Sequence, residues 1–300
     1  MLEIKKLLSE QFGNIYHPVL HRFRHREEYR ALRPVLRKSL KVMKRFEVSL
    51  RKSSVGTVVK GKSLIQIHVF YTDLLLEFYS HLKGITVPYD LYVSTDTEEK
   101  KLEIESFFRD NTLCAGKIVV GVFENRGRDV YPFLAQVHDV KDEYEYVAHF
   151  HSKKTLHSTL GDYWRQSLLE SLLGDGRRYD NAVAYFEKNP DCGLLFPEIP
   201  KAIRWRYAKA KLDEWNDGAA KDCLSMLGIT SENFCLLDYE FPIGTMFIAR
   251  IEAVRQVFEH TFKAADFPAE EGQVEHTLQH ALELVWQPVC EFNGYRLGIV

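Results

Sequence analysis

Residues 63–95 read SLIQIHVFYTDLLLEFYSHLKGITVPYDLYVST, and this stretch indicates the fold class. It opens with a short apolar run at 64–70 and closes with another at 89–94, each typical of a buried strand. Between the two runs, Thr72 or Asp73 can cap a helix whose apolar side chains share one face. A strand, a helix and a second strand in this order predict a mostly parallel sheet with helices on both faces.

The same alternation continues along the chain. Further strands are predicted at 117–123, 144–150, 193–197 and 242–250, and further helices at 98–108, 163–173 and 181–188, with two more around the loop 266–273. We therefore predict an α/β domain over residues 61–300, without internal repeats. Ligands of such sheets bind at the carboxyl ends of the strands, so the candidate site residues are sought there.

The first sixty residues differ from the rest in charge and pattern. They hold 15 Lys and Arg against 5 Asp and Glu, whereas the remaining residues hold 25 against 37. Apolar residues spaced three or four apart from Leu32 to Leu50, with basic residues between them, predict an amphipathic basic helix and no strand. This helix either packs on the main domain or meets anionic lipid headgroups at a membrane surface. The sequence has no nucleic-acid recognition motif, so no nucleic-acid partner is expected.

Composition and cysteine usage predict a cytoplasmic protein, with the basic segment 1–60 as the part that reaches the inner face of the membrane. The chain is 45% hydrophobic and 27% charged. No run approaches the ~18 apolar residues that a membrane span needs, and the first residues lack the apolar core of a signal peptide. Five cysteines without a CxxC spacing indicate reduced, mostly buried thiols.

Two arginines and a carboxylate follow the predicted strand at 117–123. The sequence there is Asn125-Arg126-Gly127-Arg128-Asp129. Guanidinium groups suit planar, two-point contact with phosphate, and glycine lets the backbone turn sharply or approach a ligand. Asp129 can orient one of the arginines or hold a sugar hydroxyl. The alternative is a turn with solvated charges, but its place after a buried strand favours a ligand site.

The next predicted strand, at 144–150, runs into His149-Phe150-His151-Ser152-Lys153-Lys154. In one interpretation His149 and His151, which share a strand face, form a metal pair, as in a metal hydrolase. In the other, Lys153 and Lys154 neutralise a leaving nucleoside diphosphate without a metal. No further histidine has a supporting ligand motif, so a divalent metal is possible here but is not required. The third interpretation is a purely structural one.

Two more stretches are candidates. Gly244, followed by Thr245, opens a predicted strand and suggests a close approach of backbone to a ligand, although a buried strand with one bulge explains it equally well. Glu270 and Glu271 are adjacent carboxylates, of which one can serve as a general base. A cluster of charges at the start of a helix is the plainer explanation of the two glutamates. Downstream lie the polar residues His276, His280 and Glu283.

Taken in order, these motifs resemble one family. They are NRGRDVYPFL at 125–134, HSKK at 151–154, WR at 164–165, GLLFP at 193–197, GTMFIAR at 244–250, EEGQ at 270–273 and HALE at 280–283, preceded by HVFYTDLL at 68–75 and YDLYVST at 89–95. The chain is similar to the rhamnan synthesis protein F family over about residues 63–290. Two departures lie on the expected acceptor side. The family usually has Asp-Gly in place of Glu275-His276 and an arginine in place of Leu284.

The resemblance implies a GT-A-like glycosyltransferase of bacterial cell-surface polysaccharide synthesis. It implies a nucleotide-sugar donor, either a dTDP- or a UDP-sugar, with rhamnose as one candidate sugar, and a lipid-linked glycan as acceptor. Where many GT-A enzymes hold a metal with Asp-x-Asp, this chain has the HSKK motif, so no cofactor is required.

The expected roles follow from these motifs. The donor is expected to contact Ser94, Asp96, Asn125, Arg126, Arg128, Asp129, His151, Lys153 and Lys154. Glu270 or Glu271 is expected to deprotonate the acceptor, while Lys153 and Lys154 stabilise the leaving diphosphate. Gly244, Thr245 and His280 are expected on the acceptor side. The alternative function is a non-catalytic module that binds a glycan or a partner transferase in a polysaccharide assembly complex.

Overall fold

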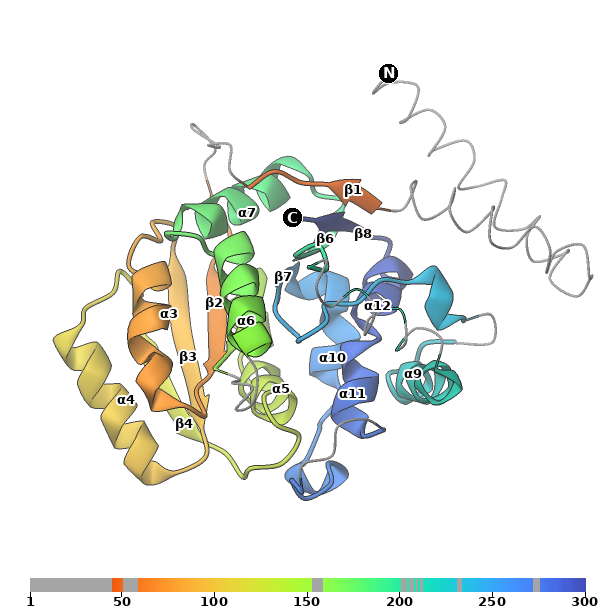
Figure 1. Cartoon of the computed structure of the whole chain (residues 1–300). Helices are drawn as coiled ribbons and strands as arrows, with labels where there is room; N and C mark the ends of the chain where they lie inside the picture. The colour runs from red at the N-terminus through yellow and green to blue at the C-terminus, as the bar shows by residue number, and fades with distance from the viewer. Residues whose placement is uncertain are drawn as a thin grey trace, which may run out of the picture. The chain divides into compact units, whose positions relative to one another are not determined.

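The computed structural model describes residues 45–50, 59–152, 159–200, 204, 208, 210, 213–230, 234–271 and 276–300 (Figure 1). Its strands form a sheet in the order β1-β8-β6-β7-β5-β2-β3-β4. The strands are β1 (Arg45–Glu47), β2 (Ser63–His68), β3 (Tyr89–Thr95), β4 (Ile118–Val122), β5 (Tyr146–His151), β6 (Cys192–Phe196), β7 (Phe247–Arg250) and β8 (Arg296–Ile299). Strands β2 to β5 are parallel and β7 runs against both of its neighbours. The predicted α/β fold with a mostly parallel sheet is confirmed.

Helices connect the strands and cover the sheet. They are α3 (Leu75–Leu82), α4 (Glu98–Asp110), α5 (Val130–His138), α6 (Thr159–Leu172), α7 (Arg177–Lys188), α9 (Glu214–Met226), α10 (Arg255–Glu259), α11 (Leu278–Glu283) and α12 (Trp286–Phe292). Short 3₁₀ turns are η1 (Thr72–Leu74), η2 (Lys141–Glu143), η4 (Leu236–Asp238), η5 (Ile251–Val254) and η6 (Ala264–Asp266). Thr97 caps α4 as its hydroxyl accepts from Lys100 N, and Asp213 caps α9 in the same way through Trp215 N.

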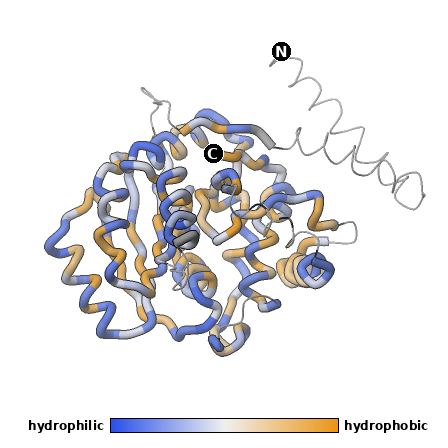
Figure 2. The backbone as a smooth tube through the Cα atoms, viewed as in Figure 1, coloured by the Kyte–Doolittle hydropathy of each residue, from blue (hydrophilic) through white to orange (hydrophobic). Residues whose placement is uncertain are grey.

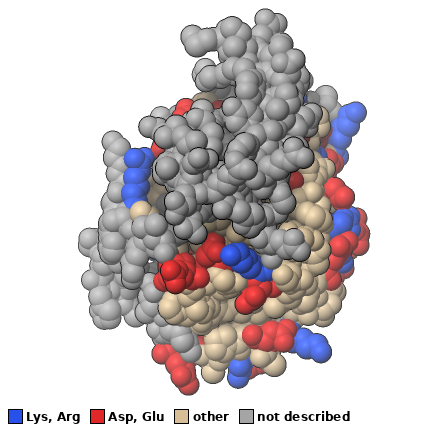
Figure 3. Space-filling model, turned by 90° about the vertical axis from the view of Figure 1, so that its right-hand side faces the viewer, with Lys and Arg blue, Asp and Glu red and all other residues tan. Residues whose placement is uncertain are grey.

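The central strands are buried on both faces, which is why apolar residues occur on both faces of each strand instead of on one alone. Every residue of β2, β3 and β5 is buried, whereas the edge strand β4 has exposed residues, Ile118 and Val119 among them. Hydrophobic residues recur along these strands in Figure 2. Figure 3 shows one face of the molecule. On its described surface, Lys and Arg residues lie close to Asp and Glu residues.

The larger core lies on one face of the sheet, under α5, α9, α10, α11 and α12. Its centre is aromatic: the ring of Phe133 lies 5.9 Å from Phe247 and 5.5 Å from Phe258, and Trp286 lies 4.3 Å from Phe247. Burial of each such side chain contributes about 1.5–3 kcal/mol. On the other face, α3, α6 and α7 stand in front of the sheet in Figure 1.

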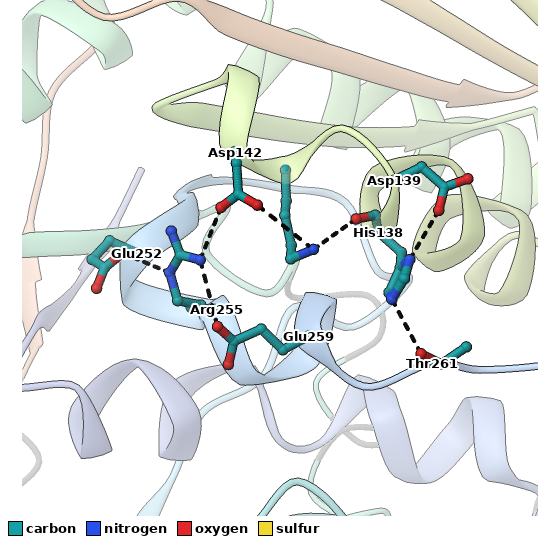
Figure 4. A network of polar contacts seen from close by, with 8 residues as sticks. His138, Asp139, Asp142, Glu252, Arg255, Glu259 and Thr261 are labelled. Atoms are coloured by element: carbon teal, nitrogen blue, oxygen red, sulfur yellow. Dashed lines mark hydrogen bonds and ion pairs between the residues drawn. The ribbon is translucent and has the colours of Figure 1, made fainter.

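A polar network fixes α10 against the end of α5 (Figure 4). Arg255 on α10 donates to Asp142 of η2 at 3.0 Å and pairs with Glu252 at 2.8 Å. His138, the last residue of α5, lies 3.2 Å from the hydroxyl of Thr261. These contacts join segments more than a hundred residues apart and help to place α5, whose other end carries the loop described below.

Several sequence predictions were wrong in detail. The predicted basic helix does not extend to Leu50, because Arg45–Glu47 is β1; residues 1–44 and 51–58, which include most of that helix, lie outside the described residues. The strand predicted at 242–250 begins only at Phe247, because Thr245 N donates to the Pro242 carbonyl at 2.7 Å and closes a turn. Helices α5, α9 and α12 and strand β8 were not predicted.

Two expectations on composition can be compared with the described chain. Cys192, Cys223 and Cys290 are buried, Cys114 is exposed and Cys235 is intermediate, and all five are free thiols. Three of the five cysteines are therefore buried, in agreement with the prediction that most of them are. Within the described ranges, no helix combines the length and the apolar character that crossing a bilayer requires.

Candidate functional site

The carboxyl ends of four parallel strands meet at one edge of the sheet. In the register of β2, His68 lies beside Ser94 of β3 on one side and beside His151 of β5 on the other. Thr95 of β3 lies beside Val122 of β4 in turn. The chain segments that leave these strands therefore begin side by side, and this strand-end edge is where the candidate residues gather.

Two predicted donor residues follow β3 at this edge. Ser94 is fully buried, and its hydroxyl lies 2.8 Å from Nε2 of Gln66 and 2.9 Å from Nδ1 of His68. Asp96, just past the strand, is partly exposed and pairs with Lys100 at 2.6 Å. Ser94 thus lies beneath the edge, whereas Asp96 lies at its surface.

The loop 125–129 follows β4 and ends at the start of α5. Gly127 and Arg128 both have positive φ, 62° and 55°, a conformation that residues other than glycine rarely adopt. Such backbone strain is concentrated at functional sites in proteins. Asn125 is exposed, and Arg126 donates to the Phe267 carbonyl at 2.9 Å and to Glu124 at 2.6 Å.

Contacts with residues 267–270 bring a distant loop to the same place. Arg126 and Ala269 form an isolated antiparallel bridge. Arg128 binds Glu270 at two points, Nε to Oε2 at 3.1 Å and Nη2 to Oε1 at 3.2 Å. Glu271 is exposed beside this pair in the sequence. The structure therefore brings the predicted phosphate-binding arginine and a predicted catalytic carboxylate into direct contact.

The end of β5 contacts the turn that precedes β7. Nε2 of His151 lies 2.5 Å from the Gly244 carbonyl oxygen, and the Gly244 amide donates to the Glu283 carboxylate. Gly244 has a φ of 90°, which glycine adopts freely, whereas Thr245 has a φ of 56°, which is unusual for a residue other than glycine. His280 lies one turn before Glu283 on α11.

The remaining pair of predicted residues, Lys153 and Lys154, lies outside the described residues. The structure does describe Ser152, from which they follow. Its hydroxyl accepts from the amides of Phe70 and Tyr71 at 2.8 and 3.0 Å, and its own amide donates to the His68 carbonyl at 2.9 Å. Residue 152 is thus held at the strand-end edge, between the segments that leave β2 and β5.

Buried polar groups support the edge from below. Nε2 of Gln66 donates to Oε1 of Gln136 at 2.9 Å, and Oε1 of Gln66 lies 2.6 Å from Nδ1 of His149. Nε2 of His149 lies 3.3 Å from Oδ2 of Asp129. This network connects β2, β5 and α5 to the loop 125–129, and all four of its residues are less than a tenth exposed.

Burial strongly affects the histidines at this edge. Burial lowers the pKa of His68 to about 4; Asp129 opposes the shift, while His151 and His149 add to it. Burial also lowers the pKa of His149, against the opposing effect of its hydrogen bond with Asp129. Neutral imidazole is the form that a desolvated site favours, so His68 is uncharged at neutral pH.

The interpretation of His149 and His151 as a metal pair does not suit this geometry. Both ring nitrogens of His149 face hydrogen-bonding partners, Gln66 and Asp129, and Nε2 of His151 faces a backbone carbonyl. In the part of the chain that the structure describes, no three His, Cys, Asp or Glu residues group in a way that could hold a metal ion.

The comparison with known families agrees with the motifs at this edge. The family described as rhamnan synthesis protein F matches residues 1–294. The chain belongs to the rhamnan synthesis protein F family. The match includes every predicted site residue, and it includes the basic N-terminal segment that the motif resemblance did not cover.

Curated relatives extend well beyond this chain. It is 31% identical over 255 residues to the uncharacterized protein WxcX of Xanthomonas campestris pv. campestris, in strain ATCC 33913 and again in strain B100. The alignment covers 83% of this chain and 34% of the relative. The chain thus spans about a third of the length of the curated relatives it matches.

Solved structures give a more distant likeness. Residues 1–349 of S. aureus TarS, solved alone and in complex with UDP, are 14% identical to this chain with a TM-score of 0.40. The superposition covers 80% of this chain and 58% of TarS in the first structure. At that TM-score the likeness carries no conclusion about this protein.

One of the two family departures has a structural explanation. His276 stands where the resemblance places a glycine, and its φ is 68°. A positive φ is the conformation that glycine adopts without strain, so the backbone here keeps the shape for which glycine is suited. Leu284, the second departure, is 3% exposed and packs in the main core.

Sequence reasoning did not find Gln66, Gln136 or the supporting role of His149. The sequence did contain a signal for Gln66 and for His149. Gln66 interrupts the apolar run LIQIHVF, and His149 interrupts YVAHF, at positions that a strand buried on both faces fills with apolar side chains. A polar residue in such a run needs a buried partner.

Proposed function

We propose that this protein is a glycosyltransferase of GT-A type that transfers a sugar from a nucleotide-sugar to a lipid-linked glycan during synthesis of a bacterial cell-surface polysaccharide. Membership of the rhamnan synthesis protein F family supports the polysaccharide and makes rhamnose the first sugar to test. The convergence of the arginine loop 125–129, the end of β5 and the loop around Glu270 at one sheet edge supports the site.

The proposed roles use groups from each segment. Arg126 and Arg128 hold the diphosphate of the donor, because guanidinium groups bind phosphate at two points. Lys153 and Lys154 neutralise the charge that develops on the leaving nucleoside diphosphate. Alignment of donor and acceptor at the edge supplies much of the rate acceleration. No metal is part of this proposal.

The acceptor side is proposed to lie at the turn 242–246 and α11. Glu270 or Glu271 removes the proton from the attacking hydroxyl, and direct attack on the donor inverts the configuration at the transferred sugar carbon. Gly244, Thr245 and His280 line the approach of the acceptor. Ser94 and Asp96 are proposed to serve the base or the ribose, Ser94 from beneath the surface.

The basic segment 1–60 is proposed to hold this cytoplasmic protein at the inner face of the membrane, where a lipid-linked acceptor is found. Its 15 Lys and Arg against 5 Asp and Glu support that role, since each basic residue near an anionic surface contributes about 1 kcal/mol. Co-sedimentation with vesicles containing anionic lipid tests it. Equal binding to neutral vesicles, or none to either kind, would contradict it.

The experiment that tests the proposed function is thermal stability across nucleoside diphosphates and nucleotide-sugars, with EDTA and with manganese. A ligand at 100 times its dissociation constant adds about 2.7 kcal/mol to the free energy of unfolding. A shift with one nucleotide class that persists in EDTA supports the transferase and names its donor. Lys153→Ala with Lys154→Ala then tests the lysines: unchanged transfer removes their proposed role.

The same panel of nucleotides distinguishes the alternative function from the transferase. A non-catalytic module predicts binding of a glycan or a partner transferase and no stabilisation by any nucleotide. If no nucleotide stabilises the protein, the transferase proposal fails, and glycan binding becomes the property to measure.

A further inference from the structure

A chain of buried amides runs beneath the loop 125–129, and its donors and acceptors can be assigned. It begins at the backbone carbonyl of Val93, which accepts from Nε2 of Gln136 at 3.2 Å. A carbonyl oxygen only accepts, so the amide nitrogen of Gln136 must face Val93 and its Oε1 must face away. The backbone thereby fixes the orientation of this amide.

Gln66 comes next in the chain. Its Nε2 donates to Oε1 of Gln136 at 2.9 Å and to the hydroxyl of Ser94 at 2.8 Å. Both hydrogens of the Gln66 amide are then used. Its Oε1 faces Nδ1 of His149 at 2.6 Å and can only accept. Nδ1 of His149 therefore carries a hydrogen.

The second ring nitrogen of His149 faces a carboxyl group. Nε2 lies 3.3 Å from Oδ2 of Asp129, with His149 fully buried and Asp129 8% exposed. A neutral ring with its hydrogen on Nδ1 has a lone pair at Nε2, and an ionised carboxylate also has only lone pairs. A hydrogen bond between the two needs one more proton. Without it, two acceptors face each other in a buried site, which is costly.

We propose that His149 and Asp129 share one proton, and that His149 is the positioning residue that holds the Asp129 carboxyl group and keeps the pair without net charge. The consequence for ligand binding rests on the proposed function. An ionised Asp129 would compete with a diphosphate for the arginines on either side of Gly127. A neutral pair removes Asp129 from that competition.

The surroundings of His149 suit this arrangement. Phe133 stacks on its ring at 4.1 Å with an interplanar angle of 14°, which fixes the ring plane. The titratable groups around it are His68 on β2 and His151 on β5, the latter with its ring 6.1 Å away, while β7 contributes an apolar ring. Burial lowers the pKa of His149 and the hydrogen bond with Asp129 opposes that shift, so the charge state of the ring depends on the carboxyl group beside it.

The shared proton is tested by nuclear magnetic resonance of protein labelled with ¹⁵N-histidine. In the wild type we expect a protonated Nδ1 at His149, with Nε2 either protonated or accepting a strong hydrogen bond. In Asp129→Asn the new amide can donate to Nε2, so we expect a neutral ring with its hydrogen on Nδ1. A wild-type Nε2 that is neither protonated nor hydrogen-bonded, a bare Nδ1 in the wild type, or a doubly protonated ring in Asp129→Asn overturns the proposal.

The positioning role is tested by the affinity of wild type and His149→Phe for UDP and for dTDP. Phenylalanine keeps the stack on Phe133 but removes the proton that the imidazole shares with Asp129, and we expect nucleotide affinity to fall about tenfold, as for loss of one hydrogen bond to a charged group. Phe133→Leu is the control: it removes the stack and lowers stability, but it keeps the proton and should keep nucleotide affinity.

The outcomes are distinguishable from failure of the proposed function. Equal nucleotide affinity of wild type and His149→Phe overturns the positioning role. If the wild type binds neither nucleotide, the proposed function fails, and the resonance experiment alone decides the shared proton. If His149→Phe does not fold, Asp129→Asn still decides it.

Discussion

Arg128 and Glu270 lie 142 residues apart in the sequence and bind each other at two points, at 3.1 and 3.2 Å. Each side chain is about a quarter exposed, 24% for Arg128 and 23% for Glu270. In the proposed transferase these two residues have different partners, a diphosphate and an acceptor hydroxyl. Donor binding that draws Arg128 towards phosphate would therefore release the Glu270 carboxylate to act as a base.

Glu270→Gln tests this exchange. The substitution removes the negative charge that competes for Arg128, so UDP affinity should rise roughly threefold, the scale of a partly exposed ion pair. If Glu270 is the base, kcat should fall at least about 100-fold. Calorimetric titration and a transfer assay measure the two effects. Weaker UDP binding in Glu270→Gln would contradict the exchange, and Glu98→Gln, which changes an exposed carboxylate on α4, serves as the control.

The sequence was sufficient to predict the sheet because its central strands are buried on both faces. Runs such as 64–70 and 89–94 carry apolar residues at both odd and even positions, as a strand covered on both faces does. The short helix α5 was missed because Pro132 interrupts VYPFL. The proline in fact lies in the first turn, where its missing N–H leaves no hydrogen bond unmade.

The candidate site was predictable only in part. Strand ends can be located from apolar runs, and parallel strands must end at one edge, so the convergence of residues 94–96, 125–129 and 151 follows from the fold. The approach of Glu270 to Arg128 does not follow, because no pattern in the sequence sets the path of the chain between β7 and α11. The buried contacts of Gln66 with His149 and Gln136 depend on register and side-chain rotamers, which periodicity does not determine.

Gly244→Ala should lower both stability and transfer. An alanine at φ 90° is strained, and its Cβ would lie 3.1 Å from the ring of Trp164 on α6. We expect a loss of about 1–3 kcal/mol in the free energy of unfolding. Movement of this residue would also disturb the hydrogen bond that its backbone amide donates to Glu283 and the contact of its carbonyl oxygen with His151.

Gly228→Ala is the matched control, measured in the same urea titration. Gly228 also has a positive φ, 74°, at the end of α9, but nothing lies within 4 Å of the added Cβ. Gly228→Ala should lower the free energy of unfolding by about 1 kcal/mol through backbone strain alone, and it should leave transfer unchanged. Equal stability losses with equal activity in the two variants would show that close packing at Gly244 has no functional effect.

Arg255→Ala should have a small, salt-dependent effect. Arg255 makes three ion pairs, with Asp142, Glu252 and Glu259, but its side chain is 33% exposed (Figure 4). Solvent screening limits such pairs, so the loss of stability should stay within about 1 kcal/mol at low salt and shrink in 1 M NaCl. Urea denaturation at both salt concentrations measures this. A loss that salt leaves unchanged would mean that packing of the arginine stem, rather than charge, fixes α10.

His68 should make the protein sensitive to mild acid. Its pKa in the folded protein is about 4, below the ordinary value of 6.5, because burial disfavours the charged ring. Between these two pH values the unfolded chain binds a proton that the folded protein excludes. The contribution of His68 is therefore complete above about pH 6.5 and is lost as the pH falls towards 4, by about 3 kcal/mol in total.

His68→Asn tests this, because asparagine keeps a polar atom near Nδ1 for the Ser94 hydroxyl but does not titrate. The variant should be less stable than the wild type at pH 7, and the difference in the free energy of unfolding should shrink or reverse by pH 4. Both proteins have the same carboxylates, so the effect of protonating them cancels in this difference. Urea denaturation at half-unit pH steps measures the difference. If the stability of His68→Asn ran parallel to that of the wild type across this pH range, the buried ring at position 68 would take up its proton without cost.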